Sequence, residues 1–286
     1  MPVKVRATRT LPGPAWAELD PLEIAPADVP GPHVEALVVV NEPVDLMLYP
    51  SLRLIANYSV GYDRIDVAAA AARGVAVTNT PGVLDAATAD LAMALMLAAR
   101  RGLGTGDRLV REGGWAGLRD GREVSGATLG IVGAGRIGSA VARRAAGFEM
   151  RILPVRRSEG DLDAVLRASD IVTLHVPLTA ETRGLISRER LALLKDGATL
   201  VNTARGGVVD EEALVAELVS GRITAGLDVF AHEPHVPQEL FDLPNVVLTP
   251  HIASDTLETR SAMSRVVVDN ILAFERGEPL PNPVSQ

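Results

Sequence analysis

The chain has 286 residues, of which 47% are hydrophobic and 22% charged, and its formal net charge is −8. This length allows about two domains of ordinary size, and the composition excludes an intrinsically disordered protein. The negative charge disfavours nucleic acid as a partner, because phosphate binding requires a broad basic surface. A small anionic ligand remains compatible, since it needs only a few local arginines.

The sequence contains no cysteine, which excludes disulfides, thiolate metal sites and cysteine nucleophiles. The opening MPVKVRATRT is not followed by the apolar stretch of a signal peptide. The longest apolar run, Leu91 to Ala99, is far short of the roughly 18 residues that a membrane span needs. We therefore expect a soluble, cytoplasmic protein with no membrane partner and no metal site.

The first part of the chain alternates weakly between strand-like and helix-like segments. Short β-rich runs are predicted at residues 3–8, 36–40, 54–58 and 75–78. One helix-like segment runs from about Thr88 through Arg111. These elements predict a first α/β domain over residues 1–98.

A more regular alternation follows. Six β-rich runs are predicted at residues 128–132, 150–155, 170–176, 198–204, 223–230 and 245–250. Helix-like segments separate them at residues 137–146, 161–168, 187–194 and 210–220. Apolar strands alternating with helices predict a parallel sheet covered on both faces, which is a doubly wound fold. Pro154 lacks the N–H that a strand ladder needs, and so it predicts that pairing of its strand ends early.

The last segment, residues 257–276, carries apolar residues at helical spacing and precedes a turn-rich tail. We predict that residues 99–255 form a dinucleotide-binding domain inserted into the first domain. Residues 256–286 then return to that first domain.

The run GAGRIG, residues 133–138, directly follows a predicted strand and opens into a helix. A lone run of this kind is a weak signal, and the alternative is an ordinary strand–turn–helix with glycines. In this context Gly133 permits the tight turn, Gly135 lets a pyrophosphate approach the backbone, and Gly138 allows helix and strand to pack closely. We predict a dinucleotide site here.

The end of the next strand indicates which dinucleotide binds. An acid about 20 residues after the first glycine would bond the ribose of NAD, but here Arg156 and Arg157 follow the strand, with no acid before Glu159. Guanidinium groups bind the 2′-phosphate of NADP through charge-assisted hydrogen bonds. NADP(H) is therefore favoured, with NAD(H) as the alternative if both arginines only form a solvated turn.

Polar side chains follow three further predicted strands, at the sheet edge where open α/β folds bind ligands. Arg205, in VNTARGG, is suited to binding a substrate carboxylate and carbonyl together, although a single loop arginine is more often a surface charge. Asp228, in LDVFAHEP, ends an apolar strand and must find hydrogen-bond donors. A nicotinamide carboxamide is one candidate donor.

Of the five histidines, His251 in TPHIAS is the one that ends an apolar strand in such a loop. A histidine acid works best with a pKa near the operating pH. A neighbouring carboxylate favours the imidazolium and raises the histidine pKa. Glu233 is the natural partner, although alone it would be read as a solvated loop residue. We expect a His–Glu pair that acts as general acid/base in the reduction of a keto acid.

The order GAGRIG, HVPLT, VNTARGGVVDEEAL, LDVFAHEP and TPHIAS resembles the D-isomer-specific 2-hydroxyacid dehydrogenases. ANYSVGYDRIDV (56–67) and TNTPGVLDAATADLAMALMLAARR (78–101) extend the resemblance from about residue 52 to the PNPV tail. It implies a Rossmann dinucleotide-binding domain inserted into a smaller flavodoxin-like substrate domain, and a homodimer.

The resemblance also implies roles for single residues. Catalysis falls to Arg205, Glu233 and His251. Backbone amides of Ser59, Val60 and Gly61 bind the substrate carboxylate, as a glycine-containing turn allows. Cofactor contacts fall on Arg136, Ile137, Pro177, Thr182, Thr203, Ala204 and Asp228, with Thr88 reaching across from the first domain.

The stretches TPGVLDAATADLA and HIASDTLETR are similar to the glyoxylate/hydroxypyruvate reductase branch. They imply reduction of glyoxylate, hydroxypyruvate or a similar 2-keto acid to the D-2-hydroxy acid. Two alternatives use the same fold. One is a dinucleotide-sensing scaffold or corepressor without catalysis, which the intact Arg205, Glu233 and His251 set disfavours. The other is a dehydrogenase for another acid, such as phosphoglycerate, phosphite or formate; formate dehydrogenases carry glutamine where Glu233 stands.

Overall fold

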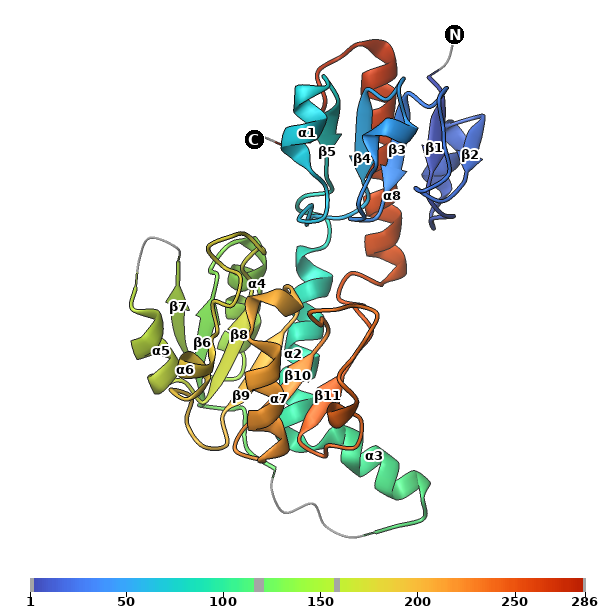
Figure 1. The fold of residues 1–286 in the computed structure, drawn as a ribbon. Helices are drawn as coiled ribbons and strands as arrows, with labels where there is room; N and C mark the ends of the chain where they lie inside the picture. Colours follow the sequence, from blue (N-terminus) through green and yellow to red (C-terminus); the bar gives the residue numbers. More distant parts are fainter. Residues whose placement is uncertain (1–2, 116–120, 157–159, 285–286) are drawn as a thin grey trace. The chain divides into compact units, whose positions relative to one another are not determined.

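The computed structural model describes residues 3–115, 121–156 and 160–284. The chain divides into two compact units (Figure 1): the first comprises Met1–Leu84 and Ser254–Gln286, and the second Asp85–Ala253. The second unit is thus inserted into the first, as the sequence predicts. The sequence predicts a boundary after residue 98, but this position lies inside helix α2 (Asp85–Arg101), and the whole of that helix belongs to the second unit.

The first unit contains a five-stranded parallel sheet in the order β2-β1-β3-β4-β5. This is the flavodoxin-like order of a doubly wound fold. Its central strands β3 and β4 are buried along their whole length, which suits a parallel sheet with both faces covered. The strands are β1 (Val5–Ala7), β2 (Leu22–Ile24), β3 (Ala36–Val39), β4 (Leu54–Asn57) and β5 (Ala76–Thr78).

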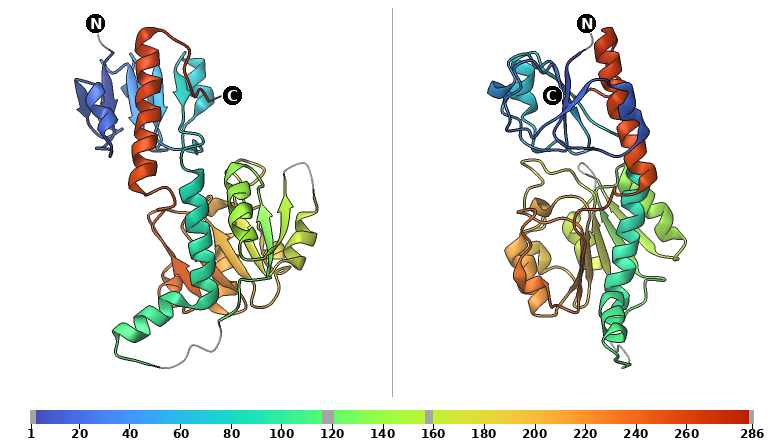
Figure 2. Two further views of the ribbon diagram at one scale, coloured as in Figure 1. Left: turned by 180° about the vertical axis from the view of Figure 1, so that it is seen from behind. Right: turned by 90° about the vertical axis from the view of Figure 1, so that its right-hand side faces the viewer.

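The α-helices of the first unit, α1 (Val67–Ala72) and α8 (Leu257–Arg276), lie on opposite faces of this sheet (Figure 2). Helix α8 has the predicted bounds, because its ends carry strong signals. The Thr256 side chain accepts from Thr259 N–H, and Gly277 closes the helix at φ 67°. Short 3₁₀ segments complete the unit: η1 (Pro14–Glu18) and η2 (Leu46–Leu48).

The second unit contains a six-stranded parallel sheet in the order β11-β10-β9-β8-β6-β7. From β6 the chain passes to β7 on one side, and β8 then lies on the other side of β6. This reversal is the topological switch point at which such sheets bind ligands. The strands are β6 (Thr128–Val132), β7 (Arg151–Val155), β8 (Ile171–Leu174), β9 (Thr199–Asn202), β10 (Thr224–Leu227) and β11 (Val246–Leu248).

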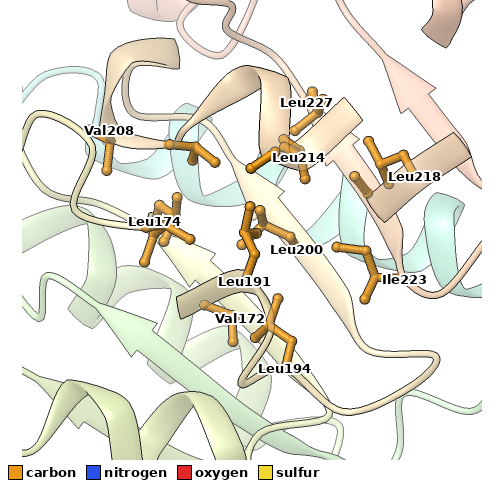
Figure 3. Packing of buried hydrophobic residues seen from close by; sticks show 14 of the residues in the cluster. Val172, Leu174, Leu191, Leu194, Leu200, Val208, Leu214, Leu218, Ile223 and Leu227 are labelled. Atoms are coloured by element: carbon orange, nitrogen blue, oxygen red, sulfur yellow. The ribbon is translucent and has the colours of Figure 1, made fainter. Parts of the chain in front are cut away.

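Helices cover both faces of the second sheet. Helices α2 (Asp85–Arg101) and α4 (Arg136–Ala146) pack together on one face. The other face is covered by α5 (Leu162–Ala168), α6 (Arg188–Leu191) and α7 (Glu211–Val219). There, strand residues such as Leu174 and Leu200 form one buried cluster with Leu214 and Leu218 of α7 (Figure 3). The remaining elements are α3 (Leu103–Arg111), η3 (Gly206–Val208) and η4 (Gln238–Leu240).

Two expectations about local structure are wrong. The helix predicted from about Thr88 through Arg111 is broken at Gly102, whose left-handed φ of 60° is accessible because glycine has no Cβ. The strand that contains Pro154 does not stop pairing early, since β7 pairs with β6 through Val155. The Val155 carbonyl accepts from Gly133 on the β6 side. Pro154 therefore faces the free edge of the sheet, where a missing N–H leaves no ladder bond unmade.

In the part of the chain that the structure describes, no helix combines the length and the apolar composition of a membrane span.

Candidate active site

The glycine turn between β6 and α4 brings three chain segments together. Gly133 has a φ of 97°, and an added Cβ would lie 2.6 Å from the His175 carbonyl oxygen at the end of β8. A Cβ on Gly138 would overlap the Gly133 carbonyl oxygen. Glycine is therefore required at both positions by close approach of backbone.

Burial lowers the pKa of His175 to about 4, so its imidazole is uncharged near neutral pH.

Gly135 differs from its two neighbours. Its φ of −78° is open to any residue, and an added Cβ would meet no protein atom within 4 Å. Neither strain nor protein packing explains this glycine. The space in front of it lies at the N-terminus of α4, where N–H groups and the helix dipole favour an anion. The turn, residues 133–138, therefore fits the pyrophosphate of a dinucleotide, and we call it the phosphate turn.

Arginines flank this turn. Arg136, the first residue of α4, is exposed and its Nε lies 3.2 Å from Asp85 Oδ2 at the start of α2. Arg156 is exposed directly after β7. The Val155 carbonyl accepts from both Gly133 and Ala134 N–H, so Arg156 begins one residue from the phosphate turn. Arg157 lies outside the described residues.

The other expected cofactor residues follow β8 and β9. The Thr182 hydroxyl donates to the Pro177 carbonyl at 2.5 Å, so these two residues are in direct contact. Thr203 and Ala204 follow β9, and among the described residues Thr203 Oγ1 is buried without a hydrogen-bond partner. A buried, unpaired hydroxyl is costly, and a polar group of a bound ligand would relieve this. Ile137 is partly exposed in α4.

Thr88 is placed differently from its expected role. It is buried in α2, and the division of the chain assigns it to the second unit rather than to the first. The expected first-domain origin of Thr88 is therefore wrong, whereas its contact with the cofactor stays a prediction.

The segment that carries Arg205 is fixed by a neighbouring side chain. Asn202, at the end of β9, accepts from Ala204 N–H and donates to the Arg205 carbonyl, both at 3.0 Å. Its amide closes the turn that projects Arg205 from the sheet edge. One nitrogen of the guanidinium, Nη1, donates to the Ala204 carbonyl at 2.7 Å.

The next residue, Gly206, joins this segment to the loop that carries Glu233. An added Cβ would overlap the Phe230 carbonyl carbon and the Ala231 nitrogen. Glu211, at the start of α7, accepts from Ala231 N–H at 2.8 Å and holds the same loop from another side. The backbone after β9 and the backbone after β10 are therefore in van der Waals contact.

His251 and Glu233 form the expected pair. His251 Nδ1 lies 2.8 Å from Glu233 Oε2, and the side chains are 45% and 33% exposed, so a ligand has access to the imidazole. Glu233 Oε1 accepts from Phe230 N–H. Burial alone would raise the pKa of Glu233, but the hydrogen bond and charge of His251 outweigh it, helped by Phe230 N–H and the charge of Arg205. The pKa of Glu233 is thus lowered, and Arg205 lies within its electrostatic reach.

His251 adopts a backbone conformation that is rare for a residue with a side chain. Its φ is 54°, in the left-handed region, which costs on the order of 1–2 kcal/mol. Its N–H donates to the Asp228 carbonyl at 2.9 Å. Such strain persists only where the surroundings enforce it.

Asp228 supplies those surroundings. Its side chain is completely buried; Oδ1 accepts from the Thr249 hydroxyl and Ile252 N–H, and Oδ2 accepts from Ala253 N–H. Burial raises the pKa of Asp228, and these hydrogen bonds only partly counteract it. The carboxylate therefore shapes the His251 loop, a role that the sequence pattern did not predict.

In the first unit, Ser59, Val60 and Gly61 follow β4 at the carboxyl edge of its sheet and are partly exposed. Within the described part of the chain, no cluster of His, Cys, Asp or Glu is suited to a metal ion.

Comparison with known proteins identifies the family. The family model "D-isomer specific 2-hydroxyacid dehydrogenase, NAD binding domain" matches residues 93–253. The chain belongs to this family. It is a D-2-hydroxyacid dehydrogenase, and the family expected from its motifs is confirmed.

Similar proteins include enzymes of known name. A glyoxylate reductase of Pyrococcus furiosus is 50% identical over 278 residues, which cover 88% of this chain and 83% of that protein. A Thermus thermophilus protein of known structure is 42% identical, with a TM-score of 0.90 over 99% of this chain and 100% of the other. An NADPH-dependent glyoxylate/hydroxypyruvate reductase from Sinorhizobium meliloti, solved with NADP and malonate, is 36% identical, with a TM-score of 0.90 over 100% and 97% of the two chains.

Gly206→Ala forces backbone apart between the segments that carry Arg205 and Glu233, and we expect kcat/KM for the keto acid to fall roughly 100-fold, because misplacement by about 1 Å can cost that much. The thermal midpoint should fall as well. Gly207→Ala is the matched control, since its Cβ would meet only side-chain atoms at 3.4 Å. Equal activity in both variants would contradict the assigned role of the contact.

Proposed function

We propose that this enzyme reduces a small 2-keto acid of the glyoxylate and hydroxypyruvate type to the D-2-hydroxy acid, with NADPH as the preferred reductant. The observation that carries the proposal is the 2.8 Å His251–Glu233 pair within electrostatic reach of Arg205. All three residues follow strands of the sheet that also bears the phosphate turn. The names of the similar reductases support the substrate class.

Arg205 binds the substrate carboxylate and carbonyl oxygen, because a guanidinium presents several donors to such a pair. Its charge stabilises the negative charge that develops on that oxygen. When bound, the reduced nicotinamide supplies a hydride to the carbonyl carbon. The carbonyl π electrons pass to the oxygen, which needs a proton.

His251 provides that proton. Its Nδ1 donates to Glu233, which leaves Nε2 to protonate the alkoxide oxygen. The ionised Glu233 fixes the ring orientation and stabilises the imidazolium before transfer. The pKa of Glu233 is lowered by His251, which favours the charged, accepting form of the carboxylate.

The test is the initial rate of NADPH oxidation with glyoxylate, hydroxypyruvate, pyruvate and phenylpyruvate. We expect turnover by the wild type and a loss of roughly 10²–10⁴-fold in kcat for His251→Ala, because general acid catalysis contributes that much. The Kd of NADPH should change little, since the lost group acts on the substrate oxygen.

His235→Ala is the control, because His235 is exposed in the loop that carries Glu233. No turnover by a wild type that binds the dinucleotide would favour a sensing scaffold. Equal loss of turnover and cofactor affinity in His251→Ala would indicate a structural histidine.

The NADPH preference is proposed from Arg156, whose position after β7 is one residue from the phosphate turn. Arg156→Asp should lower the ratio of kcat/KM for NADPH to that for NADH at least roughly tenfold, because a charge-assisted hydrogen bond is lost and a repulsive charge is added. Arg151→Asp, exposed at the other end of β7, is the matched control. An unchanged ratio in the Arg156 variant would remove it from cofactor selection.

We also propose a homodimer that uses α3 and Trp115. Leu103, Val110 and Trp115 are 56%, 55% and 91% exposed, and large exposed apolar side chains in one short stretch of chain are typical of interfaces. The proposed partner at this surface is a second copy of this chain, because closed two-fold dimers are the commonest assemblies of soluble proteins. Replacing Leu103 and Val110 together by Glu should give a monomer in light scattering. Val219→Glu, at a position equally exposed on α7, should leave the mass unchanged. A monomeric wild type would contradict the proposal.

A further inference from the structure

The loop Ser59–Gly61 of the first unit is held by its carbonyl groups. The Gly61 carbonyl accepts from Asn57 Nδ2 at 2.8 Å, and the Val60 carbonyl accepts from Asn79 Nδ2 at 2.9 Å. The Ser59 carbonyl accepts from Asn57 Nδ2 at 3.3 Å and from Thr80 N–H at 3.0 Å. All three successive carbonyls are therefore bound by protein donors.

The N–H groups of the same loop are in the opposite situation. Among the described residues, the N–H groups of Ser59, Val60 and Gly61 have no hydrogen-bond acceptor. A peptide unit is planar, with its C=O and N–H on opposite sides. Binding the Ser59 and Val60 carbonyls therefore turns the N–H groups of Val60 and Gly61 away from the asparagines that hold them. Unpaired N–H groups in a turn form an anion site.

Asn57 is itself fixed in orientation. It ends β4 with 1% of its surface exposed, and its Oδ1 accepts from Asn41 N–H at 2.8 Å. Because this oxygen faces a donor, the amide nitrogen must face the loop. Asn41 in turn holds the far end of the loop, since its Oδ1 accepts from Arg64 N–H. The amide of Asn57 is thus a rigid, uncharged link between the sheet and the loop.

We propose that Asn57, assisted by Asn79, is a positioning residue that fixes the loop for a substrate carboxylate. This inference rests on the proposed function, because it assumes a carboxylate substrate at these N–H groups. An amide suits the role for two reasons. It donates to two carbonyls at once, and it adds no negative charge beneath an anion.

The decisive variant is Asn57→Asp, which keeps the size of the side chain and the acceptor for Asn41 N–H. An ionised carboxylate cannot donate to Ser59 and Gly61, and it repels a bound anion. We expect KM for glyoxylate and the inhibition constant of oxamate, an unreactive carboxylate, to rise at least roughly tenfold. We expect kcat to change less than KM and the Kd of NADPH to stay within about twofold, because the phosphate turn lies in the other unit.

Asn57→Ala removes the donor without adding a charge, and it serves if the aspartate variant does not fold. It should raise KM in the same direction by a smaller factor. Asn270→Asp is the matched control: Asn270 is an equally buried asparagine of the first unit, but its amide donates to Val266 O and Asn282 Oδ1. It should leave KM unchanged whatever it does to the thermal midpoint.

An unchanged KM and oxamate constant in a folded Asn57 variant would overturn the inference, as would a matching KM increase in Asn270→Asp. Failure of the proposed function has a different signature, namely no turnover by the wild type with any keto acid. In that case calorimetric binding of oxamate to wild type and Asn57→Asp still tests the anion site. Weaker binding by the variant supports it, and equal binding overturns it.

Discussion

The active site depends on one buried carboxylate. Asp228 accepts hydrogen bonds from Thr249, Ile252 and Ala253 and, through its carbonyl, from His251. Four donors on one residue give the loop after β11 a single shape and keep His251 in the left-handed region. Complete burial strengthens these bonds, because a low local dielectric leaves no competing water. The backbone thus positions His251, and the contact with Glu233 fixes the orientation of its ring.

Close contact between loops provides the second constraint. A parallel sheet brings the carboxyl ends of its strands to one edge. Side chains from different loops come within hydrogen-bonding distance of one another there only if the loops themselves are in contact. Two glycine contacts achieve this: Gly133 meets the backbone after β8, and Gly206 meets the backbone after β10. Gly135 has another origin, since only the space beside it explains the missing side chain. Glycines at the same edge of the sheet therefore have different causes. Close backbone contact requires Gly133 and Gly206, whereas the open space beside Gly135 fits a bound ligand.

Much of the fold could be predicted from the sequence, since apolar strands, helix caps and the GAGRIG turn are local signals. Helix α8 is an example, with Thr256 and Gly277 at its ends. Strand β2 is not predicted because three residues, none of them buried, carry no periodicity. Helix α1 is not predicted because its body is almost all alanine and shows no apolar face. The loop-shaping roles of Asn202, Glu211 and Asp228 were also missed. Each depends on which backbone N–H or carbonyl lies opposite, and residue spacing does not contain that information.

The insertion of the second unit gives the chain two covalent crossings, and both lie beside functional groups. After Leu84, the next residue is Asp85, whose carboxylate pairs with Arg136 of the phosphate turn. Before Ser254, the last residue is Ala253, whose N–H binds Asp228. A change of backbone torsion between Leu84 and Asp85 therefore affects the pair of Asp85 with Arg136. A change between Ala253 and Ser254 affects the hydrogen bond from Ala253 N–H to Asp228. The residues that link the two units covalently are thus also the ones that hold the phosphate turn and the loop after β11.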